Sequence, residues 1–341
     1  YRGYDSAGIA LSDGGEIRVI RRKGRVSELE FARSFAGTMG IGHTRWATHG
    51  APSERNAHPQ SYGRISLVHN GIIENAAELR KECEARGEVF SSDTDSEIAA
   101  HLVEEYLDEE GELLRAVRRA TERLTGSYAL AVLCRGRREI VCARMHSPLI
   151  VAWGEGEGFA ASDASAIAGE GRLACVLEDG DFARLTMRGA EVFDEDLCPI
   201  ERPVFSLGAE EAAPEKGEFH HFMRKEIAEV PFAVESTLKA LSKGDFDALC
   251  KVLCQTKYLH IVACGTAYHS GLCLKYAAER LSRVLTEVFL ASEYRYADPI
   301  VPEKTLTIAV SQSGETADTL AAAALAKERG SLVLAVTNVE R

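Results

Sequence analysis

Two apolar segments near the end of the chain are each followed by a turn of small, hydroxyl-bearing residues and then by a helical pattern. Residues 259–263 lead into Cys264-Gly265-Thr266, and residues 306–310 lead into Ser311-Gln312-Ser313-Gly314-Glu315-Thr316. A short apolar run before a helix is typical of a buried parallel strand. The first N–H groups of a helix have no partner within it, and together with the helix dipole they attract an anion. The sequence therefore predicts an α/β unit that binds a phosphorylated small molecule between two such turns.

The composition narrows the classes of function. The chain has 341 residues, enough for two domains, and its 45% hydrophobic and 27% charged residues are typical of a globular protein. A formal charge of −12 argues against a general nucleic-acid binder, which normally presents a basic face. No apolar run approaches the roughly 20 residues of a membrane helix, and no secretory signal is visible. We therefore expect a cytoplasmic protein that has neither nucleic acid nor membrane as a partner.

The nine cysteines lack the dense spacing of a secreted disulfide scaffold, so we expect them to be reduced thiols. Cys250 and Cys254 have the spacing of half a metal site, but no second pair of cysteines or set of histidines completes it. We expect these two residues to be buried thiols near a helix end, and we expect no metal site.

The first 204 residues consist mostly of short apolar segments punctuated by Gly, Asp and Pro, which predicts stacked antiparallel sheets. The strands expected are Ile9–Leu11, Ile17–Arg21, Ile65–His69, Tyr128–Cys134, Ile140–Ala143, Leu149–Trp153, Leu173–Leu177 and Phe182–Met187. Apolar residues that recur every three or four positions predict helices at 74–86, 94–107 and 112–124.

The pattern changes after residue 204. Residues 205–219 are polar and small and contain Pro and Gly, as is typical of a linker. Residues 220–341 begin with an expected helix that ends near Leu241, and strands and helices alternate after it. We therefore expect one domain at 1–204 and a second at 220–341.

Three polar clusters in the first domain contain side chains suited to binding and catalysis. They span residues 43–50, 69–75 and 92–97. Arg45 offers a planar guanidinium that suits a carboxylate. Asn70 and Gly71 offer a side-chain amide and a backbone N–H that can stabilise an oxyanion, but Asn-Gly is also the commonest hairpin turn.

Other members of these clusters have ordinary structural explanations. Asp95 stands where a helix begins, and a carboxylate there caps the helix and complements its dipole. Trp46 is a large packing anchor. The spacing of His43 and His49 alone favours structural roles. From the residues alone, both the structural and the functional explanations stay open.

In their joint order, these clusters resemble the glutaminase domain of the class II glutamine amidotransferases, over residues 1 to about 200. The segment Phe222-Met223-Arg224-Lys225-Glu226-Ile227 and the two hydroxyl-rich turns resemble family members with a sugar isomerase (SIS) domain. The resemblance implies an α+β/α/β fold: a four-layer αββα domain of the N-terminal nucleophile type, then a truncated SIS-type domain with a flavodoxin-like parallel sheet. It implies a homodimeric enzyme without a cofactor that converts D-fructose 6-phosphate and L-glutamine to glucosamine 6-phosphate and glutamate.

The resemblance also implies how glutamine is held in the first domain. Arg45 would bind the α-carboxylate of glutamine, and Asp95 would bind its α-ammonium group. Asn70 and the N–H of Gly71 would form the oxyanion hole. Each role suits the chemistry of the residue, because a carboxylate attracts a guanidinium and a developing oxyanion needs fixed donors.

Further roles follow from the same resemblance. Thr48 and His49 would help to bind and orient glutamine, and Trp46 would gate a channel that carries ammonia to the second domain. The residues implied in binding the sugar phosphate are Gly265, Thr266, Ser311, Gln312, Ser313 and Thr316.

The family's nucleophile is a cysteine at the mature amino terminus, and the α-amino group of that cysteine acts as the base. This residue would lie upstream of Tyr1, and the acid–base groups of the isomerase would lie beyond Arg341. We therefore expect an internal fragment that binds both substrates in part and completes neither half-reaction.

Two other functions remain open. A class II amidotransferase with another acceptor, such as a phosphoribosyl or aspartyl transferase, would show a pyrophosphate-binding fingerprint or an ATP pyrophosphatase loop, and neither is present in the sequence. A non-catalytic sugar-phosphate sensor would keep the binding turns and lack the nucleophile. The residue that begins the mature protein distinguishes the sensor from the enzyme.

Overall fold

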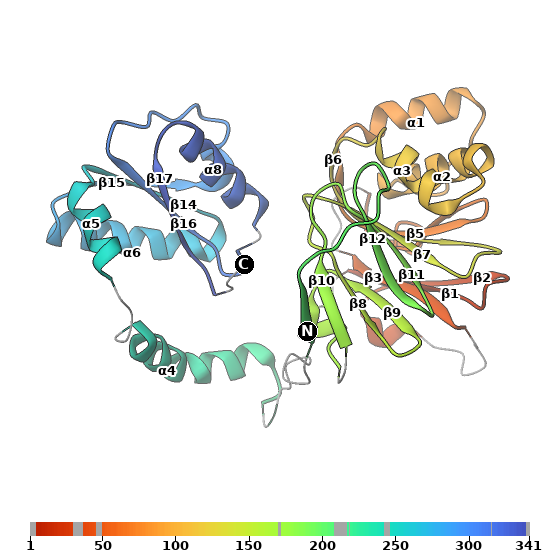
Figure 1. Ribbon diagram of the computed structural model, residues 1–341, viewed down its shortest axis with the longest axis horizontal. Coiled ribbons are helices and arrows are strands. Elements are labelled where there is room, and N and C mark those ends of the chain that lie inside the picture. Colours follow the sequence, from red (N-terminus) through yellow and green to blue (C-terminus); the bar gives the residue numbers. More distant parts are fainter. Residues whose placement is uncertain are drawn as a thin grey trace. The chain divides into compact units, whose positions relative to one another are not determined.

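The computed structural model describes residues 5–29, 37–45, 50–169, 172–207, 217, 219–241, 246–314 and 316–338. The chain divides into two compact units, Tyr1–Gly217 and Glu218–Arg341. Figure 1 shows the first unit in red to green and the second in teal to blue. Among the described residues, no helix is long and apolar enough to cross a membrane.

A six-stranded antiparallel sheet forms the centre of the first unit, with the strand order β12-β11-β7-β6-β5-β4 (Figure 1). Its strands are β4 (Gln60–Tyr62), β5 (Ile65–Ile73), β6 (Gly126–Cys134), β7 (Ile140–Met145), β11 (Phe182–Thr186) and β12 (Gly189–Phe193). The longest pairing joins β5 to β6, from Ile65 opposite Cys134 to Ile73 opposite Gly126.

The side chains of β5 explain why this sheet lies in the middle of the unit. Ile65 and Leu67 are buried in the core that the sheet shares with the helices. Val68 is buried on the opposite face, where it packs with Ala10 and Ile41 of a smaller sheet. Because alternate residues of a strand point to opposite faces, both faces of the sheet are buried.

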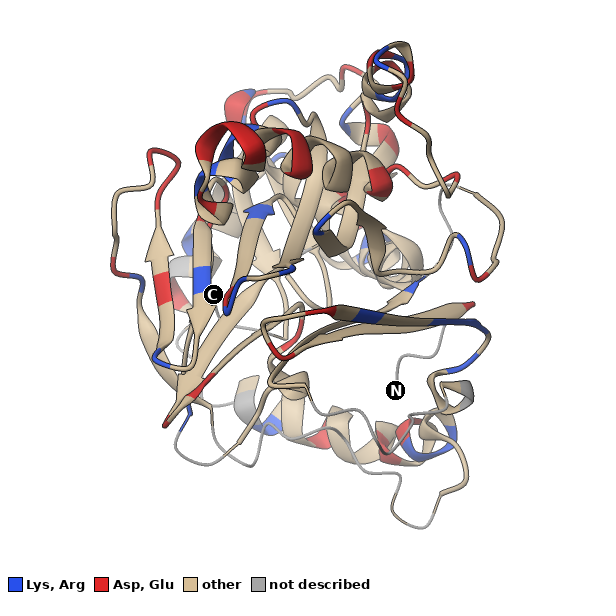
Figure 2. Cartoon of the chain, turned by 90° about the vertical axis from the view of Figure 1, so that its right-hand side faces the viewer, with Lys and Arg blue, Asp and Glu red and all other residues tan. Residues whose placement is uncertain are grey.

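Three helices cover one face of the six-stranded sheet: α1 (Ala76–Ala85), α2 (Ser96–Glu110) and α3 (Leu113–Thr121) (Figure 1). Ile98 and Leu102 of α2 are buried four positions apart, as a helical packing stripe requires. Acidic and basic residues are interspersed on the outer side of these helices, as Figure 2 shows. The helices expected at 74–86, 94–107 and 112–124 are thus present with slightly different ends.

Two smaller antiparallel sheets pack against the other face of the six-stranded sheet. In one of them β3 contacts β5 and β6; in the other, β8 contacts β12, and β9 contacts β11 and β12. One has the order β2-β1-β3, with β1 (Ser6–Ser12), β2 (Ile17–Lys23) and β3 (Met39–Arg45). The other has the order β13-β10-β8-β9, with β8 (Ile150–Gly154), β9 (Glu157–Ala161), β10 (Arg172–Val176) and β13 (Val204–Leu207). The described part of this unit also contains the 3₁₀ segments η1 (Val26–Glu28) and η2 (Ala164–Ala166).

The described part of the first unit therefore has one layer of helices and two layers of sheet, as expected for the αββ part of an αββα arrangement. Within the described ranges of this unit, no second layer of α-helices is seen. β13 pairs with β10 and ends at Leu207, so the first unit continues into the segment that the sequence suggests as a linker. The position of the domain boundary stays a prediction.

The second unit contains a four-stranded parallel sheet with helices on its faces, as the alternating pattern predicts (Figure 1). Its helices are α4 (Phe222–Leu241), α5 (Asp247–Gln255), α6 (Gly265–Leu281), α7 (Ala291–Tyr294) and α8 (Ala317–Glu328). Its strands are β14 (Tyr258–Ala263), β15 (Leu285–Leu290), β16 (Thr305–Val310) and β17 (Leu332–Val336). In the order β15-β14-β16-β17, the chain passes from β14 to its neighbour β15 on one side, and then crosses to β16 and β17 on the other side of β14. Ligands bind to such sheets at the carboxyl ends of the two strands where the direction changes, here β14 and β16.

Apolar residues bury both faces of this parallel sheet. Ile261 and Ile308 belong to the core on one face, and Val262 and Ala309 belong to the core on the other. Gly271 brings α6 close to the sheet, because a Cβ there would lie 2.9 Å from a methyl carbon of Ile261. This glycine therefore serves the packing of the helix.

One expectation about the cysteines is wrong. Cys250 and Cys254 of α5 are exposed rather than buried. On α5, Leu249 and Val252 are half-buried, whereas the four-residue spacing of the two cysteines places both of them on the exposed side of the helix.

Candidate active site

The first unit contains a pocket of about 810 Å³ that brings three of its sheets together. It is lined by residues of β3 and β5, by the first residues of α2, and by the segment from the end of β9 through η2. Four residues predicted from sequence line it: Arg45, Asn70, Gly71 and Asp95. Trp46, Thr48 and His49 lie outside the described residues.

Arg45 is the last residue of β3, where its backbone pairs with Ser6 of β1. Its side chain is buried, and Nη2 donates a hydrogen bond to the carbonyl oxygen of Gly50 at 3.3 Å. Burial lowers the pKa of Arg45 from its ordinary 12.5, while the charges of Asp5 and Asp95 oppose the shift. The guanidinium remains charged at neutral pH, so it supplies a fixed cation inside the pocket.

Asn70 and Gly71 lie within β5, where they pair with Ala129 and Tyr128 of β6. The reading of Asn-Gly as a hairpin turn is therefore wrong. Gly71 has φ +143°, and a Cβ there would lie 2.1 Å from the carbonyl oxygen of Ser127. Only glycine fits this close approach of two strands, which holds the backbone of β5 against β6 beside the pocket.

Asp95 immediately precedes α2, but its side chain makes no capping hydrogen bond to that helix. Instead, its Oδ2 accepts a hydrogen bond from the backbone N–H of Ile73 at 2.9 Å. The interpretation as a helix cap is therefore wrong for the side chain. The carboxylate is tied to β5, two residues beyond Gly71, and it is buried at the pocket wall.

Three histidines, His43, His58 and His69, also line the pocket. The rings of His43 and His58 have centroids 4.5 Å apart, and His69 Nδ1 lies 2.8 Å from Ser96 Oγ. Burial, followed by the charges of His69 and Arg45, lowers the pKa of His43 to about 4. Burial also lowers the pKa of His58 well below its ordinary value. His43 and His58 are therefore neutral at pH 7 and do not compete with Arg45 for an anion.

These shifts predict a loss of stability in mild acid. The pKa of His43 is about 4 in the folded protein and 6.5 in the unfolded chain, so the unfolded chain binds a proton first as pH falls. The stabilisation is complete above pH 6.5 and is lost as pH falls towards 4, by up to about 3 kcal/mol. The free energy of unfolding in urea at pH 7 and pH 5 measures this. His43→Asn should reduce the difference between the two pH values, and the part due to His58 should remain. If the free energy of unfolding changed equally between pH 7 and pH 5 in His43→Asn and in the unmodified chain, the lowered pKa of His43 would be contradicted.

The hydroxyl-rich turns of the second unit lie at the carboxyl ends of β14 and β16, whose last residues, Ala263 and Val310, pair with each other. Ser311 Oγ lies 3.0 Å from Thr316 Oγ1 and accepts a hydrogen bond from the N–H of Gly314 at 3.1 Å. Gly265 has φ +57° at the first position of α6. The two turns therefore lie side by side at the point where this fold class binds ligands.

The remaining residues predicted for the sugar phosphate differ in exposure. Thr266 and Gln312 are exposed, and Ser313 is half-buried. Cys264 is in extended conformation before α6, and its side chain makes no capping hydrogen bond. The Cys264 side chain therefore does not occupy the N–H groups at the start of α6. An anion site at a helix N-terminus needs such N–H groups to be available.

Comparisons with known proteins agree with this arrangement. Residues 43–169 match the glutamine amidotransferase domain, and residues 253–341 match the SIS domain. Glutamine–fructose-6-phosphate aminotransferases (isomerizing) from Symbiobacterium thermophilum and Thermus thermophilus are 48% and 46% identical, over 99% and 100% of this chain and 58% of each relative. This chain belongs to that family.

The chain spans about 58% of the length of these aminotransferases. A solved structure described as the allosteric regulatory enzyme of purine biosynthesis is also similar, with 18% identity, a TM-score of 0.50, and coverage of 98% of this chain and 75% of that one. At this identity the likeness concerns the fold alone. The order of an amidotransferase domain and a SIS domain is thus the one that the sequence motifs predict for the aminotransferase family.

Some residues of this pocket were missed from sequence. His58 lies in a polar segment whose sequence is typical of a surface loop, yet its side chain is buried beside the ring of His43. The backbone of His58 packs against β1, because a Cβ at Gly8 would meet the carbonyl oxygen of His58. The β9–η2 segment also lines the pocket, with Asp163 accepting hydrogen bonds from the N–H and hydroxyl of Ser165. The Asp-x-Ser pattern could have indicated this turn, but no sequence signal places it opposite β5.

Proposed function

We propose that this chain supplies substrate sites of a glutamine–fructose-6-phosphate aminotransferase, which makes glucosamine 6-phosphate and glutamate. The observation that carries the proposal is the grouping of Arg45, Asp95 and the pair Asn70–Gly71 around one pocket. A cation, an anion and two amide donors match the α-carboxylate, the α-ammonium and the side-chain carbonyl of L-glutamine. The family membership of the chain supports the same assignment.

The strand β5 supports catalysis in this proposal. When a nucleophile attacks the side-chain amide of glutamine, its carbonyl oxygen becomes an oxyanion. The amide group of Asn70 and the N–H of Gly71 would donate hydrogen bonds to it. Because these donors belong to a strand paired with β6, they need no rearrangement during the reaction. Removing one such donor typically costs about 10²–10³-fold in kcat.

The cysteines of the described residues do not supply the nucleophile. None of them lines the described pocket. Burial raises the pKa of Cys142 to about 12 and that of Cys175 to about 11, so these thiols do not form the thiolate that attacks carbonyl carbon. The proposal therefore keeps the amino-terminal cysteine of the family as nucleophile.

Other parts of the proposal rest on the family resemblance. Thr48 and His49 as glutamine ligands and Trp46 as an ammonia gate stay predictions, as do a homodimer and a cytoplasmic location. In the second unit, the paired turns after β14 and β16 would hold the phosphate of fructose 6-phosphate. The contact between Ser311 and Thr316 supports this, because it orients two hydroxyl groups within one turn.

Calorimetric titration of the protein with L-glutamine and, separately, with fructose 6-phosphate tests the proposal. We expect both to bind, and D-glutamine to bind at least tenfold more weakly, because Arg45 and Asp95 fix the two groups on the α-carbon. No binding of L-glutamine, or equal affinity for both enantiomers, would overturn the assignment of the first pocket.

The double substitution Ser311→Ala with Thr316→Ala should weaken fructose 6-phosphate binding. Hydrogen bonds to a charged group contribute about 1.5–3 kcal/mol each, so the two losses should raise Kd by at least tenfold. Thr256→Ala is the matched control, since its hydroxyl bonds only to Val252 O at the end of α5, before β14 begins. Unchanged affinity in the double variant, measured by calorimetry, would refute the phosphate assignment.

A further inference from the structure

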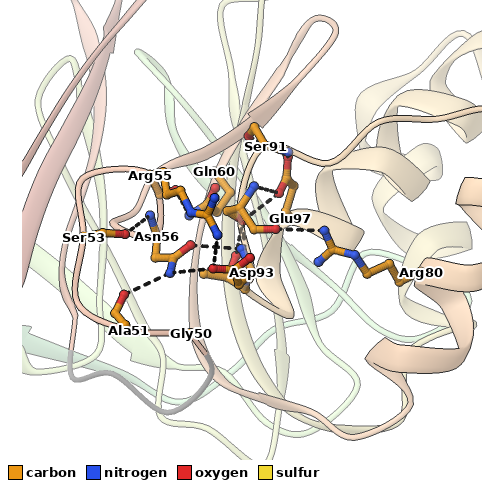
Figure 3. A network of polar contacts seen from close by, with 12 residues as sticks. Gly50, Ala51, Ser53, Arg55, Asn56, Gln60, Arg80, Ser91, Asp93 and Glu97 are labelled. Atoms are coloured by element: carbon orange, nitrogen blue, oxygen red, sulfur yellow. Dashed lines mark hydrogen bonds and ion pairs between the residues drawn. The ribbon is translucent and has the colours of Figure 1, made fainter.

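Asn56 lies between β3 and β5 in sequence, and its side chain is 1% exposed. Its Nδ2 donates hydrogen bonds to the carbonyl oxygen of Ala51 at 2.9 Å and to Asp93 Oδ2 at 3.3 Å. Its Oδ1 accepts a hydrogen bond from the N–H of Asp93 at 2.9 Å. Figure 3 shows this amide in the middle of a network that joins the segment after Gly50 to the segment before α2. One planar group thus fixes the backbone at Ala51 and the backbone at Asp93, which lies 37 residues after Asn56.

The first of these stretches orients Arg45. The carbonyl oxygen of Gly50 accepts the hydrogen bond from Arg45 Nη2. Gly50 packs directly on the network: a Cβ there would lie 2.7 Å from Asn56 Nδ2 and 3.1 Å from Asp93 Cβ, and its φ is +78°. The position of the carbonyl that holds the guanidinium therefore depends on the position of the Asn56 amide.

The second stretch carries Asp95. Asn56 holds the backbone of Asp93, two residues before Asp95. Glu97 fixes the same segment from the other side, because its carboxylate accepts hydrogen bonds from the N–H groups of Ser91 and Ser92, each at 2.7 Å. The backbone just before Asp95, from Ser91 to Asp93, is therefore held by two side chains, Asn56 and Glu97.

We propose that Asn56 is a positioning residue that sets the spacing between the Arg45 guanidinium and the Asp95 carboxylate. This inference rests on the proposed function, in which these two charges hold the α-carboxylate and α-ammonium of glutamine. The role requires a side chain that donates and accepts at once. An aspartate at position 56 would accept from the N–H of Asp93 but could not donate to Ala51 O, and it would repel the Asp93 carboxylate.

Arg55 provides a matched control within the same network. Arg55 forms an ion pair with Asp93 Oδ2, the same atom to which Asn56 Nδ2 donates a hydrogen bond. Both side chains of the ion pair are more than half exposed, at 60% and 51%. Arg55→Met removes the exposed pair and leaves the hydrogen bonds of Asn56 in place. An exposed ion pair contributes little, so this variant should retain the geometry of the pocket.

The test compares Asn56→Asp, Arg55→Met and the unmodified protein in calorimetric titrations with L-glutamine and with fructose 6-phosphate, and by thermal unfolding. For Asn56→Asp we expect a Kd for L-glutamine raised at least tenfold and an unchanged Kd for fructose 6-phosphate. In the full-length enzyme that carries the amino-terminal cysteine, the glutamine KM should rise much more than kcat falls. Arg55→Met should stay within threefold throughout. Because a change at a buried site can impair folding, Gly50→Ala tests the same contact from the opposite side and should also weaken glutamine binding.

The outcomes separate the two proposals. If the unmodified protein does not bind L-glutamine, the proposed function fails and this inference falls with it. If the unmodified protein binds L-glutamine and folded Asn56→Asp and Gly50→Ala bind it within threefold of the same Kd, the positioning role alone is overturned. An equal fall in affinity for Arg55→Met would also overturn it, because the effect would then belong to the charge of Asp93.

Discussion

Gly71→Ala should destabilise the first unit by about 2–5 kcal/mol, the sum of a left-handed backbone cost and an overpacking cost. At φ +143° an L-residue is strained, and the new Cβ would lie 2.1 Å from Ser127 O and 2.7 Å from Ser127 C. Both of these atoms belong to backbone. β5 and β6 are paired along the whole of β5, so neither strand can move away without breaking its ladder of hydrogen bonds. Any variant that still folds should carry the N–H of residue 71 away from the pocket.

Gly136→Ala is the matched control for this change. Gly136 also has positive φ, at +84°, and lies in the connection between β6 and β7, but a Cβ there would meet nothing within 4 Å. We expect Gly136→Ala to lower the free energy of unfolding only by the backbone cost, about 1–2 kcal/mol. Urea unfolding of the two variants measures the difference. Equal losses would show that φ alone matters and that the contact with Ser127 does not.

Arg45→Ala should abolish most L-glutamine binding and leave fructose 6-phosphate binding unchanged. A charged hydrogen bond contributes about 1.5–3 kcal/mol, which corresponds to about a 10–150-fold rise in Kd. The effect should be large because the guanidinium is buried and already oriented by Gly50, and no other Lys or Arg lines the described pocket. Arg45→Lys should recover only part of the affinity, since an ammonium lacks the planar pair of donors.

Arg22→Met serves as the comparison for Arg45→Ala. Arg22 lies on β2 of the same sheet, but its side chain is exposed and pairs with Glu54 at 3.6 Å, away from the pocket. It should leave glutamine affinity unchanged. Calorimetry on both variants, with both ligands, shows whether the loss of glutamine affinity comes from the removed pocket side chain or from the change in net charge. Undiminished glutamine affinity in Arg45→Ala would refute the carboxylate-binding role.

The regular elements were largely predictable from sequence because they follow apolar periodicity. The segment expected at Ile65–His69 is the first half of β5, and the prediction stopped there because Asn-Gly normally turns a chain. β3 was missed because Gly40 and Gly42 interrupt it and its side chains show no apolar alternation. Its pairing with β1 comes from tertiary context, which a single sequence does not report.

The candidate site was predictable as a set of residues but not as an arrangement. Asp95 looked like a helix cap because its partner, the N–H of Ile73, is 22 residues away. Asn56 gave no signal at all, since its hydrogen bonds to Asp93 cross 37 residues. Polar residues whose partners are distant in sequence look like ordinary loop residues until the fold brings those partners together.

The link between Asp95 and β5 has a consequence for the choice of substrate. Ile73, whose N–H holds the Asp95 carboxylate, lies two positions after Gly71 on β5, and a strand advances about 3.3 Å per residue. Under the proposed function, the spacing of residues along β5 therefore selects the length of the substrate's side chain. An amino acid anchored at its α-ammonium presents its amide to Gly71 only if its side chain spans this interval. Asparagine, one methylene shorter than glutamine, would fall short, so discrimination between the two amides would depend on the pitch of a backbone and not on the width of the pocket.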